Sequence, residues 1–241
     1  MKTRAFANRN LKEMLRDPLQ LLFAMGLPAA LICMLSLLNQ KLGNAIFPIG
    51  KLAPGIAAFS FSFLTLFGGM LIANDRSTSF LSRLFAGPMR ASEYILGYAL
   101  PMLPLALMQS VLCLGLGVLF GLPVSWRLLG CLAALIPAAL LYIALGLLLG
   151  SAFSTQQVTG FGNILIQAGA WLSGLWFDLD LIGGAFKTLC YCLPFAHATE
   201  LASAALAGNV SAILPHLWPV LAYAAALFAL ACVVFRKKMK G

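Results

Sequence analysis

The chain has 241 residues, of which 61% are hydrophobic and 10% are charged, and its mean hydropathy is +0.95. Soluble domains contain about 45–50% apolar and about 25% charged residues, so this composition excludes an ordinary soluble protein. The formal net charge of +9 is compatible with nucleic-acid binding in principle. The basic residues lie between apolar stretches, however, and this placement indicates membrane topology and no nucleic-acid partner.

Six apolar stretches without Lys, Arg, Asp or Glu predict six transmembrane helices, so the expected fold class is an all-α integral membrane protein. A helix that rises about 1.5 Å per residue needs roughly 20 residues to cross a hydrocarbon core of about 30 Å. Since the stretches take up most of the chain, we expect one transmembrane domain over residues 1–241 and no separate soluble domain. The stretches are residues 19–38, 53–73, 94–119, 128–150, 158–177 and 215–235.

Residues 5–17 are predicted to form an amphipathic helix before the first span. Such a helix lies in the membrane interface, where its cations meet anionic lipid headgroups; a solvated basic leader is the alternative. Asp17-Pro18 predicts an N-cap and a first helical residue, at the point where the chain turns into the membrane. The apolar and the basic positions recur at helical spacing on two sides, and they are Ala7, Leu11, Met14 and Leu15, and Arg9, Lys12 and Arg16, respectively.

The first span could instead be the apolar core of a cleaved signal peptide. The stretch 19–38 is longer than the about 7–15 apolar residues of such a core, and no A-x-A-like site follows it. We therefore expect this stretch to remain as the first span.

The polar segment after the second span contains a short predicted helix over residues 77–87. Ser77 or Thr78 can cap this helix, and Gly87-Pro88 ends it. Because so short a helix is unstable alone in water, we expect it to dock on a protein partner, with lipid headgroups as the alternative. Its apolar face and the arginines around it are Phe80, Leu81, Leu84 and Phe85, and Arg76, Arg83 and Arg90, respectively.

The distribution of Lys and Arg predicts the topology. Because basic residues are retained on the cytoplasmic side of short loops, the side that holds twelve of them is expected to face the cytoplasm, together with both chain ends. The opposite loops hold only Lys41, Lys51, Arg127 and Lys187. The twelve are Lys2, Arg4, Arg9, Lys12, Arg16, Arg76, Arg83, Arg90, Arg236, Lys237, Lys238 and Lys240.

Spans two and five contain groups of polar and aromatic residues, which could contact a bound molecule. Phe59, Ser62 and Phe63 belong to a run of alternating aromatic and hydroxyl residues in span two, part of which is expected to face lipid. Asn163, Gln167 and Trp171 follow at i, i+4 and i+8 in span five and form one stripe. The alternative for this stripe is polar contact between helices.

Glycine and proline positions predict how the spans pack. The spacings Gly117-x-x-x-Gly121 and Gly146-x-x-x-Gly150 are typical of closely approaching helices. Kinks are expected in spans three and four, at Pro101, Pro104 and Pro137.

The segment from 178 to 212 holds the few candidates for chemistry outside the spans. His197-x-x-Glu200 could supply two metal ligands from one helix face, but third and fourth ligands are not evident. We therefore expect His197 and Glu200 to be polar groups of this outer segment, with no metal and no catalytic residue. Cys190 and Cys192 lack the C-x-x-C spacing of redox or zinc motifs.

At this point the sequence resembles the permease subunit of a type-2 ATP-binding-cassette (ABC) exporter. Residues 10–18, with the sequence Asn-Leu-Lys-Glu-Met-Leu-Arg-Asp-Pro, are similar to the family's elbow helix, and Asp75-Arg76 with residues 81–88 is similar to its coupling helix. Residues 173–177 resemble the end of span five, and residues 193–200 resemble the segment that folds back into the outer leaflet before the last span. The resemblance therefore implies a re-entrant hairpin in which His197 and Glu200 form an outer gate. It also implies that spans two and five line the dimer interface through which substrate passes, and the candidates for substrate contact are Phe59, Ser62, Phe63, Asn163, Gln167 and Trp171.

The resemblance implies a dimer of two permeases, either identical or homologous, with two ATPase subunits that bind ATP and Mg²⁺. No phosphate-binding loop G-x-x-x-x-G-K-[ST] occurs in the sequence, so this chain is not expected to be an enzyme by itself or to bind a cofactor. The location implied is a bacterial cytoplasmic (inner) membrane. The ATPase-coupling residues that the resemblance implies are Arg76, Ser79, Phe80, Leu81, Arg83, Leu84, Phe85 and Pro88.

The expected substrate is hydrophobic or amphipathic, such as a drug, an antibiotic, a modified peptide or a lipid, because the candidate lining has aromatic, hydroxyl and amide groups without charge. Multidrug or antibiotic resistance is the biological role this suggests. A polysaccharide or polymer exporter of the same family is the first alternative. An ion-coupled secondary transporter is a weaker alternative, because the spans lack the carboxylates on which proton relays depend.

Overall fold

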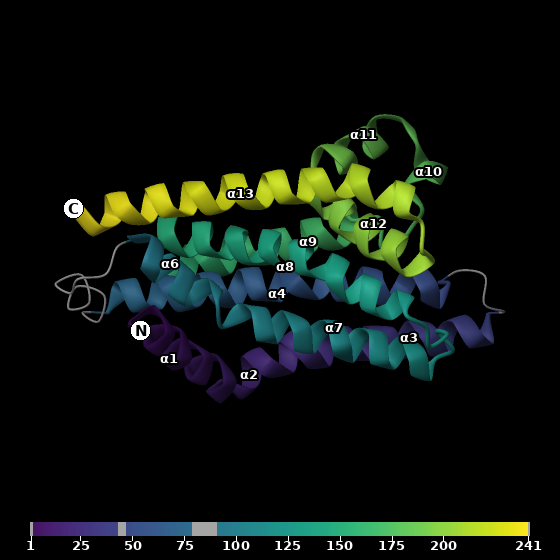
Figure 1. The fold of residues 1–241 in the computed structure, drawn as a ribbon, viewed down its shortest axis with the longest axis horizontal. Helices are drawn as coiled ribbons and strands as arrows, with labels where there is room; N and C mark the ends of the chain where they lie inside the picture. The colour runs from purple at the N-terminus through teal and green to yellow at the C-terminus, as the bar shows by residue number, and fades with distance from the viewer. Residues whose placement is uncertain (1, 43–46, 79–90, 241) are drawn as a thin grey trace.

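The structure is a computed structural model that describes residues 2–42, 47–78 and 91–240, and every regular element in these ranges is a helix (Figure 1). This confirms the predicted all-α class. The elements are α1 (Lys2–Arg16), α2 (Pro18–Leu21), the π-helix η1 (Leu22–Gly26), α3 (Leu27–Lys41), α4 (Ile49–Ser77), α6 (Ala91–Ala99), α7 (Met102–Leu119), α8 (Arg127–Ala152), α9 (Thr155–Leu172), α10 (Leu179–Ile182), α11 (Gly184–Cys192), α12 (Pro194–Ala207) and α13 (Val210–Lys240).

Five helical segments are long and apolar enough to cross a membrane, and they coincide with five of the six expected spans. They are Pro18–Lys41, Ile49–Ser77, Ala91–Leu119, Arg127–Ala152 and Val210–Lys238. The remaining expected span, 158–177, corresponds to α9, which is 18 residues long and begins Thr155-Gln156-Gln157. Because α9 also contains two further amides, its composition is more polar than that of the five, and the count of six spans stays a prediction.

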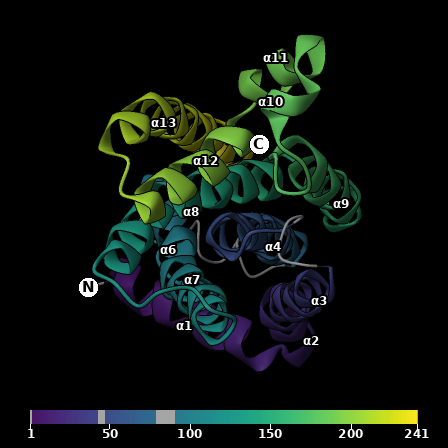
Figure 2. The same cartoon turned by 90° about the vertical axis from the view of Figure 1, so that its right-hand side faces the viewer.

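Helix α4 lies in the middle of the bundle. Figure 2 shows it enclosed by α3, α7, α8 and α9, and 94% of its apolar window is buried. Phe59, Ser62 and Phe63 are each at most 6% exposed. The expectation that part of the aromatic and hydroxyl set of this span faces lipid is therefore wrong, because neighbouring helices cover α4 on all its sides.

Glycines allow α4 and α8 to approach to backbone distance. A Cβ atom added to Gly146 would lie 2.7 Å from the Thr65 carbonyl oxygen, and one added to Gly150 would lie 2.5 Å from the Gly69 carbonyl oxygen. The Thr65 hydroxyl also donates a hydrogen bond of 2.7 Å to the carbonyl of Tyr142 in α8. The predicted close approach at Gly146-x-x-x-Gly150 is confirmed, and it is made with α4.

The two glycines of the other pair, Gly117 and Gly121, have different structural roles. A Cβ atom on Gly117 would lie 2.8 Å from the Ala53 Cβ atom, so α7 approaches α4 there. Gly121, in contrast, has φ of +102° and nothing within 4 Å of an added Cβ, because it lies in the turn after α7. The predicted close approach thus holds for Gly117 and is wrong for Gly121, whose glycine is needed for the positive φ.

Proline divides the third span and leaves the fourth intact. Helix α6 ends at Ala99 and α7 begins at Met102, with Pro101 at the N-cap position between them. Pro137 lies inside α8, which continues to Ala152. At the start of the first span, Asp17 is the predicted N-cap: its carboxylate accepts hydrogen bonds from the backbone N–H groups of Leu19 and Gln20.

The two chain termini, the C-terminal end of α4 and the N-terminal end of α6 lie at one end of the bundle. Helices α10 to α12 lie at the other end (Figure 1). The segment predicted as a re-entrant hairpin, 178–212, contains these three short helices and the start of α13. Its insertion into an outer leaflet stays a prediction. The arrangement separates two polar regions, one beside the N-terminus and one around α10 to α12.

Replacing Gly146 by Ala should destabilise the fold, because the new methyl group meets backbone atoms of α4 that have no rotamer to change. We expect a loss of about 1–3 kcal/mol, the usual cost of overpacking. The check is the unfolding free energy in mixed micelles titrated with sodium dodecyl sulfate. Gly115→Ala is the matched control, since nothing lies within 4 Å of its Cβ position; equal losses in the two variants would contradict the close approach.

Candidate functional site

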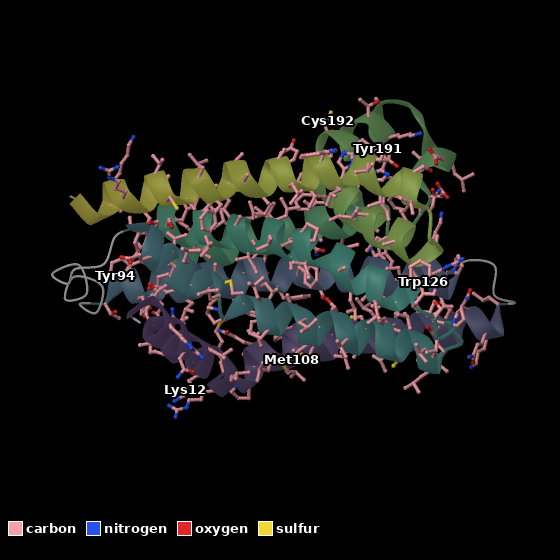
Figure 3. The ribbon with its side chains drawn as sticks, viewed as in Figure 1. Lys12, Tyr94, Met108, Trp126, Tyr191 and Cys192 are labelled. Atoms are coloured by element: carbon pink, nitrogen blue, oxygen red, sulfur yellow. The ribbon has the colours of Figure 1, made fainter. Side chains whose placement is uncertain are left out.

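The N-terminal helix α1 packs against α6 through aromatic and amide contacts. The ring of Phe6 lies edge-on to the rings of Tyr94 and Tyr98, with centroids 5.8 and 4.9 Å away. Asn10 is fully buried and its amide donates a hydrogen bond of 3.1 Å to the Gly97 carbonyl. In Figure 3 Tyr94 is labelled at the end of the bundle that holds the N-terminus.

The buried side of α1 differs in part from the predicted apolar stripe. Ala7 and Met14 are buried as expected, but Leu15 is 44% exposed, and Phe6 and Asn10 take part in the contact with α6. The periodicity identified the helix, while the partner that its buried side contacts could not be read from it.

A charged network joins α1 to the end of α4. Arg9 donates two hydrogen bonds to the carboxylate of Asp75, at 2.6 and 3.1 Å, and Tyr98 donates a third at 2.8 Å. Arg9 also pairs with Glu13 at 2.7 Å. The Asp75 side chain is 5% exposed, so its charge is stabilised by these donors and hardly by water. We call Arg9, Glu13, Asp75 and Tyr98 the elbow network.

Sequence reasoning missed the elbow network. Asp75 entered only as part of the Asp75-Arg76 pair, and Tyr98 did not enter at all. One signal was present: a carboxylate directly after a long uncharged span needs a donor when it is buried, and the basic helix at residues 2–16 is a source of donors.

Arg76 binds the end of α8. Its Nη1 group lies 2.8, 2.7 and 3.3 Å from the carbonyl oxygens of Gly150, Ser151 and Phe153. These carbonyls belong to the last turn of α8 and the linker to α9, where a helix leaves acceptors without intrahelical partners. The side chain predicted to contact an ATPase therefore fastens α4 to the α8–α9 junction in this structure.

Most of the predicted coupling helix lies outside the described residues. The described range that contains α4 ends at Thr78, which is the C-cap of this helix. Ser77 is the last residue of α4 and does not begin a new helix. The residues predicted for coupling that fall outside are Ser79, Phe80, Leu81, Arg83, Leu84, Phe85 and Pro88. Their role stays a prediction.

The candidate substrate-path residues do not share one surface. Phe59, Ser62 and Phe63 lie inside the bundle on α4, whereas Asn163, Gln167 and Trp171 are exposed on the outer side of α9. Trp171 is 58% exposed and stacks on Phe177, with centroids 6.4 Å apart. Neither amide has a hydrogen-bond partner among the residues that the structure describes. Substrate contact by these residues stays a prediction.

At the other end of the molecule, the two histidines of the chain contact each other. His197 of α12 and His216 of α13 have their Nδ1 atoms 2.9 Å apart, and the Nε2 atom of His197 lies 3.0 Å from the Tyr191 carbonyl oxygen. The Tyr191 carbonyl can only accept, so His197 Nε2 donates, and in the neutral form of His197 its Nδ1 accepts from His216. The Tyr191 ring stacks on His216 at 6.2 Å, and partial burial lowers the pKa of His197.

Glu200 takes no part in that contact, so His197 and Glu200 have different partners. Glu200 lines a pocket of about 350 Å³ between the start of α4, the loop after α9, and α10 and α12. Across this outer pocket Lys51 pairs with Asp178 at 3.0 Å. Burial raises the pKa of Glu200 despite the nearby Lys51, whereas a backbone hydrogen bond from Asp180 and the Lys51 ammonium lower the pKa of Asp178.

The described residues contain no group of three or more His, Cys, Asp or Glu side chains placed to hold a metal ion. The cysteines that are described, Cys190 and Cys192 among them, are all free thiols.

Comparisons with a family model and with individual proteins both identify transporter sequences as similar to this chain. Residues 1–207 match the family described as ABC-2 type transporter. The chain is also similar to proteins named "Probable multidrug ABC transporter permease YbhR" from Escherichia coli strain K12 and from Escherichia coli O157:H7, at 25% identity over 172 residues in each case. The matched segment covers 70% of this chain and 47% of each relative, so the chain spans about half the length of the curated relatives it matches.

Asp75→Asn should loosen the contact of α1 with α4 and α6, because the amide keeps the shape but loses the charge that Arg9 and Tyr98 bind. We expect a loss of about 1.5–3 kcal/mol in unfolding free energy, the range for hydrogen bonds to charged groups. Faster tryptic cleavage within α1 should accompany it. Glu13→Gln is the control: this exposed i, i+4 pair should contribute only about 0.3–0.5 kcal/mol. If the two losses are the same, Asp75 is not the centre of the network.

Proposed function

The chain belongs to the ABC-2 type transporter family, and from this premise we propose that it is the permease subunit of an ATP-driven exporter in a bacterial cytoplasmic membrane. Two such permeases and two separate ATPase subunits, which bind ATP and Mg²⁺, would form the transporter. The observation that carries the proposal is the elbow network together with Arg76, because both fix the end of α4 immediately before the segment proposed to contact the ATPase.

The coupling proposal follows from these contacts. A displacement of residues 79–90 by an ATPase would act directly on Thr78 and Ala91, the residues that border the segment. Asp75 and Arg76, one turn before Thr78, are bound to α1, α6 and the end of α8. A movement there would therefore be passed to these three helices at once.

A second permease would cover the exposed side of α9. The amides of Asn163 and Gln167 face outward beside the apolar, 64% exposed Ile164 and have no partner among the described side chains. Within a bilayer, polar side chains without partners are unfavourable, and a second helix or a water-filled path would satisfy them. This supports a dimer interface or a substrate path along α9.

The proposed substrate is a hydrophobic or amphipathic molecule. The similar Escherichia coli proteins carry the name probable multidrug ABC transporter permease, and this chain has an uncharged amide and indole stripe on α9. Both features favour a drug-like molecule, and resistance to such compounds would be the physiological result.

Leu84→Asp should abolish copurification of the ATPase subunit while leaving membrane insertion intact, because a charge would replace an apolar docking contact. The partner is first identified by pull-down of the tagged chain from native membranes and then measured by quantitative mass spectrometry, with at least a tenfold loss expected. Leu84→Met keeps an apolar side chain and should retain the partner. Undiminished copurification with the aspartate variant would reject this docking face.

Gln167→Leu, combined with Asn163→Leu, should lower export of an amphipathic dye from cells at unchanged protein level, by at least fivefold, because the variant removes the polar stripe of α9. Native mass spectrometry of the purified chain would show whether the loss comes from the dimer or from the substrate path. Ile164→Leu, on the same exposed side, should leave export and dimer fraction as they are. Full export by the double-leucine variant would remove α9 from both roles.

A further inference from the structure

The outer pocket combines aromatic walls with one unpaired carboxylate. Phe47, Trp176 and Phe177 line it, and its volume of about 350 Å³ falls within the range of small-molecule sites, which is about 300–1,000 Å³. Phe47 is fixed in place because its backbone exchanges two hydrogen bonds with the Asn39 side chain, at 3.0 and 3.1 Å. The aromatic residues of the wall thus come from two separate parts of the chain, the segment before α4 and the loop after α9.

The pocket lining carries one more carboxylate than ammonium group. Lys51 and Asp178 neutralise each other at 3.0 Å. Asp180, on α10, forms an ion pair with Lys187, away from the pocket lining. Glu200 has no hydrogen bond or ion pair within the described part of the chain, although it is half-buried. Its charge is therefore the one left over on the pocket wall.

A neighbouring hydroxyl also lacks a partner. Thr199 lines the same pocket, is 6% exposed, and its Oγ1 atom makes no hydrogen bond among the described residues. Its methyl carbon lies 3.5 Å from the Cβ position of Gly55, so the methyl side of Thr199 faces α4. A buried polar group without a partner costs free energy, and such a group at a pocket wall points to a bound molecule or water.

Carboxylate and aromatic groups together select a particular ligand chemistry. The face of an aromatic ring and a carboxylate both attract a positively charged nitrogen, whereas an anion would be repelled by Glu200 and would have to displace Asp178 from Lys51. A divalent metal would need more oxygen ligands than the two carboxylates of this pocket supply. The apolar walls favour a ligand with a hydrophobic body.

We propose that the outer pocket binds a small amphipathic organic cation, with its charged nitrogen against Glu200 and its apolar body among Phe47, Trp176 and Phe177. The pocket lies at the end of the bundle opposite to the chain termini (Figure 1). This inference rests on the proposed function, since it names the class of molecule that the exporter would release on that side.

The test uses the full chain in lipid nanodiscs and radiolabelled phenyltrimethylammonium as the probe. Binding should saturate, and unlabelled phenyltrimethylammonium should compete at least tenfold better than tert-butylbenzene, its uncharged isostere, at equal free concentration in water. Equal competition by the two molecules, or no saturable binding, would overturn the proposal.

Two substitutions should change binding in opposite directions. Glu200→Gln should weaken phenyltrimethylammonium binding at least tenfold, because it removes the unpaired charge. Lys51→Met should strengthen binding several-fold, because Asp178 then joins Glu200 as an uncompensated carboxylate. A gain of affinity cannot result from misfolding, so this variant keeps the test decisive. Asp180 acts on Glu200 only from outside the pocket lining and is paired with Lys187, so Asp180→Asn should change affinity much less than Glu200→Gln; an equal effect of the two variants would indicate only general surface charge.

The pH dependence provides an independent readout. Burial raises the pKa of Glu200, and the charged groups that face it are Lys51 on α4 with Asp178 and Asp180 around α10. Since the carboxylate is the binding form, affinity should be full above this raised pKa and fall as the pH drops through it. The Glu200→Gln variant should show no such fall; a fall of the same size in that variant would contradict the role of Glu200.

The same preparations separate this inference from the proposed function. If the ATPase copurifies with the chain but the cation does not bind, the pocket assignment fails and the permease function stands. If the cation binds and no ATPase is found in native membranes, the proposed function fails and the pocket remains a binding site.

Discussion

The backbone contact between α4 and α8 is the interaction on which the rest of the structure depends. Gly146 and Gly150 let the α4 backbone at Thr65 and Gly69 come within a distance that no side chain would permit. With these two helices joined so closely, α3, α7, α9 and α12 can cover the other sides of α4 and bury it (Figure 2). In a bilayer there is little hydrophobic gain from joining helices, so dispersion at such close contacts is a principal source of stability.

Helix α4 also connects the two polar regions of the molecule. Its first turns contribute Lys51 to the outer pocket, and its last turns contribute Asp75 and Arg76 to the contacts with α1, α6 and α8. Between these ends the helix is apolar and enclosed. A rigid element with charged partners at both ends can relate events at one end of the bundle to the other without any charged residue in between.

The sequence was sufficient for features that depend on local pattern. Length and apolarity predicted six spanning helices, five of which coincide with helices long and apolar enough to span. The Asp-Pro pattern predicted the Asp17 cap, and the glycine spacing predicted the close approach at Gly146 and Gly150. The sequence was insufficient where the partner is distant: Arg9 and Asp75 are 66 positions apart, and His197 meets a histidine 19 positions away. It also missed the burial of α4, because lipid-facing and protein-facing sides of a membrane helix are equally apolar and periodicity cannot separate them.

The side chain of Arg76 joins the end of α4 to the junction between α8 and α9. Its guanidinium reaches three carbonyl oxygens around Ser151, at the junction where α8 ends and α9 begins. All three contacts are made by one nitrogen, Nη1, at the end of a helix where carbonyl groups lack intrahelical partners. The junction from which α9 starts is consequently anchored to the last turn of a helix that lies far earlier in the chain.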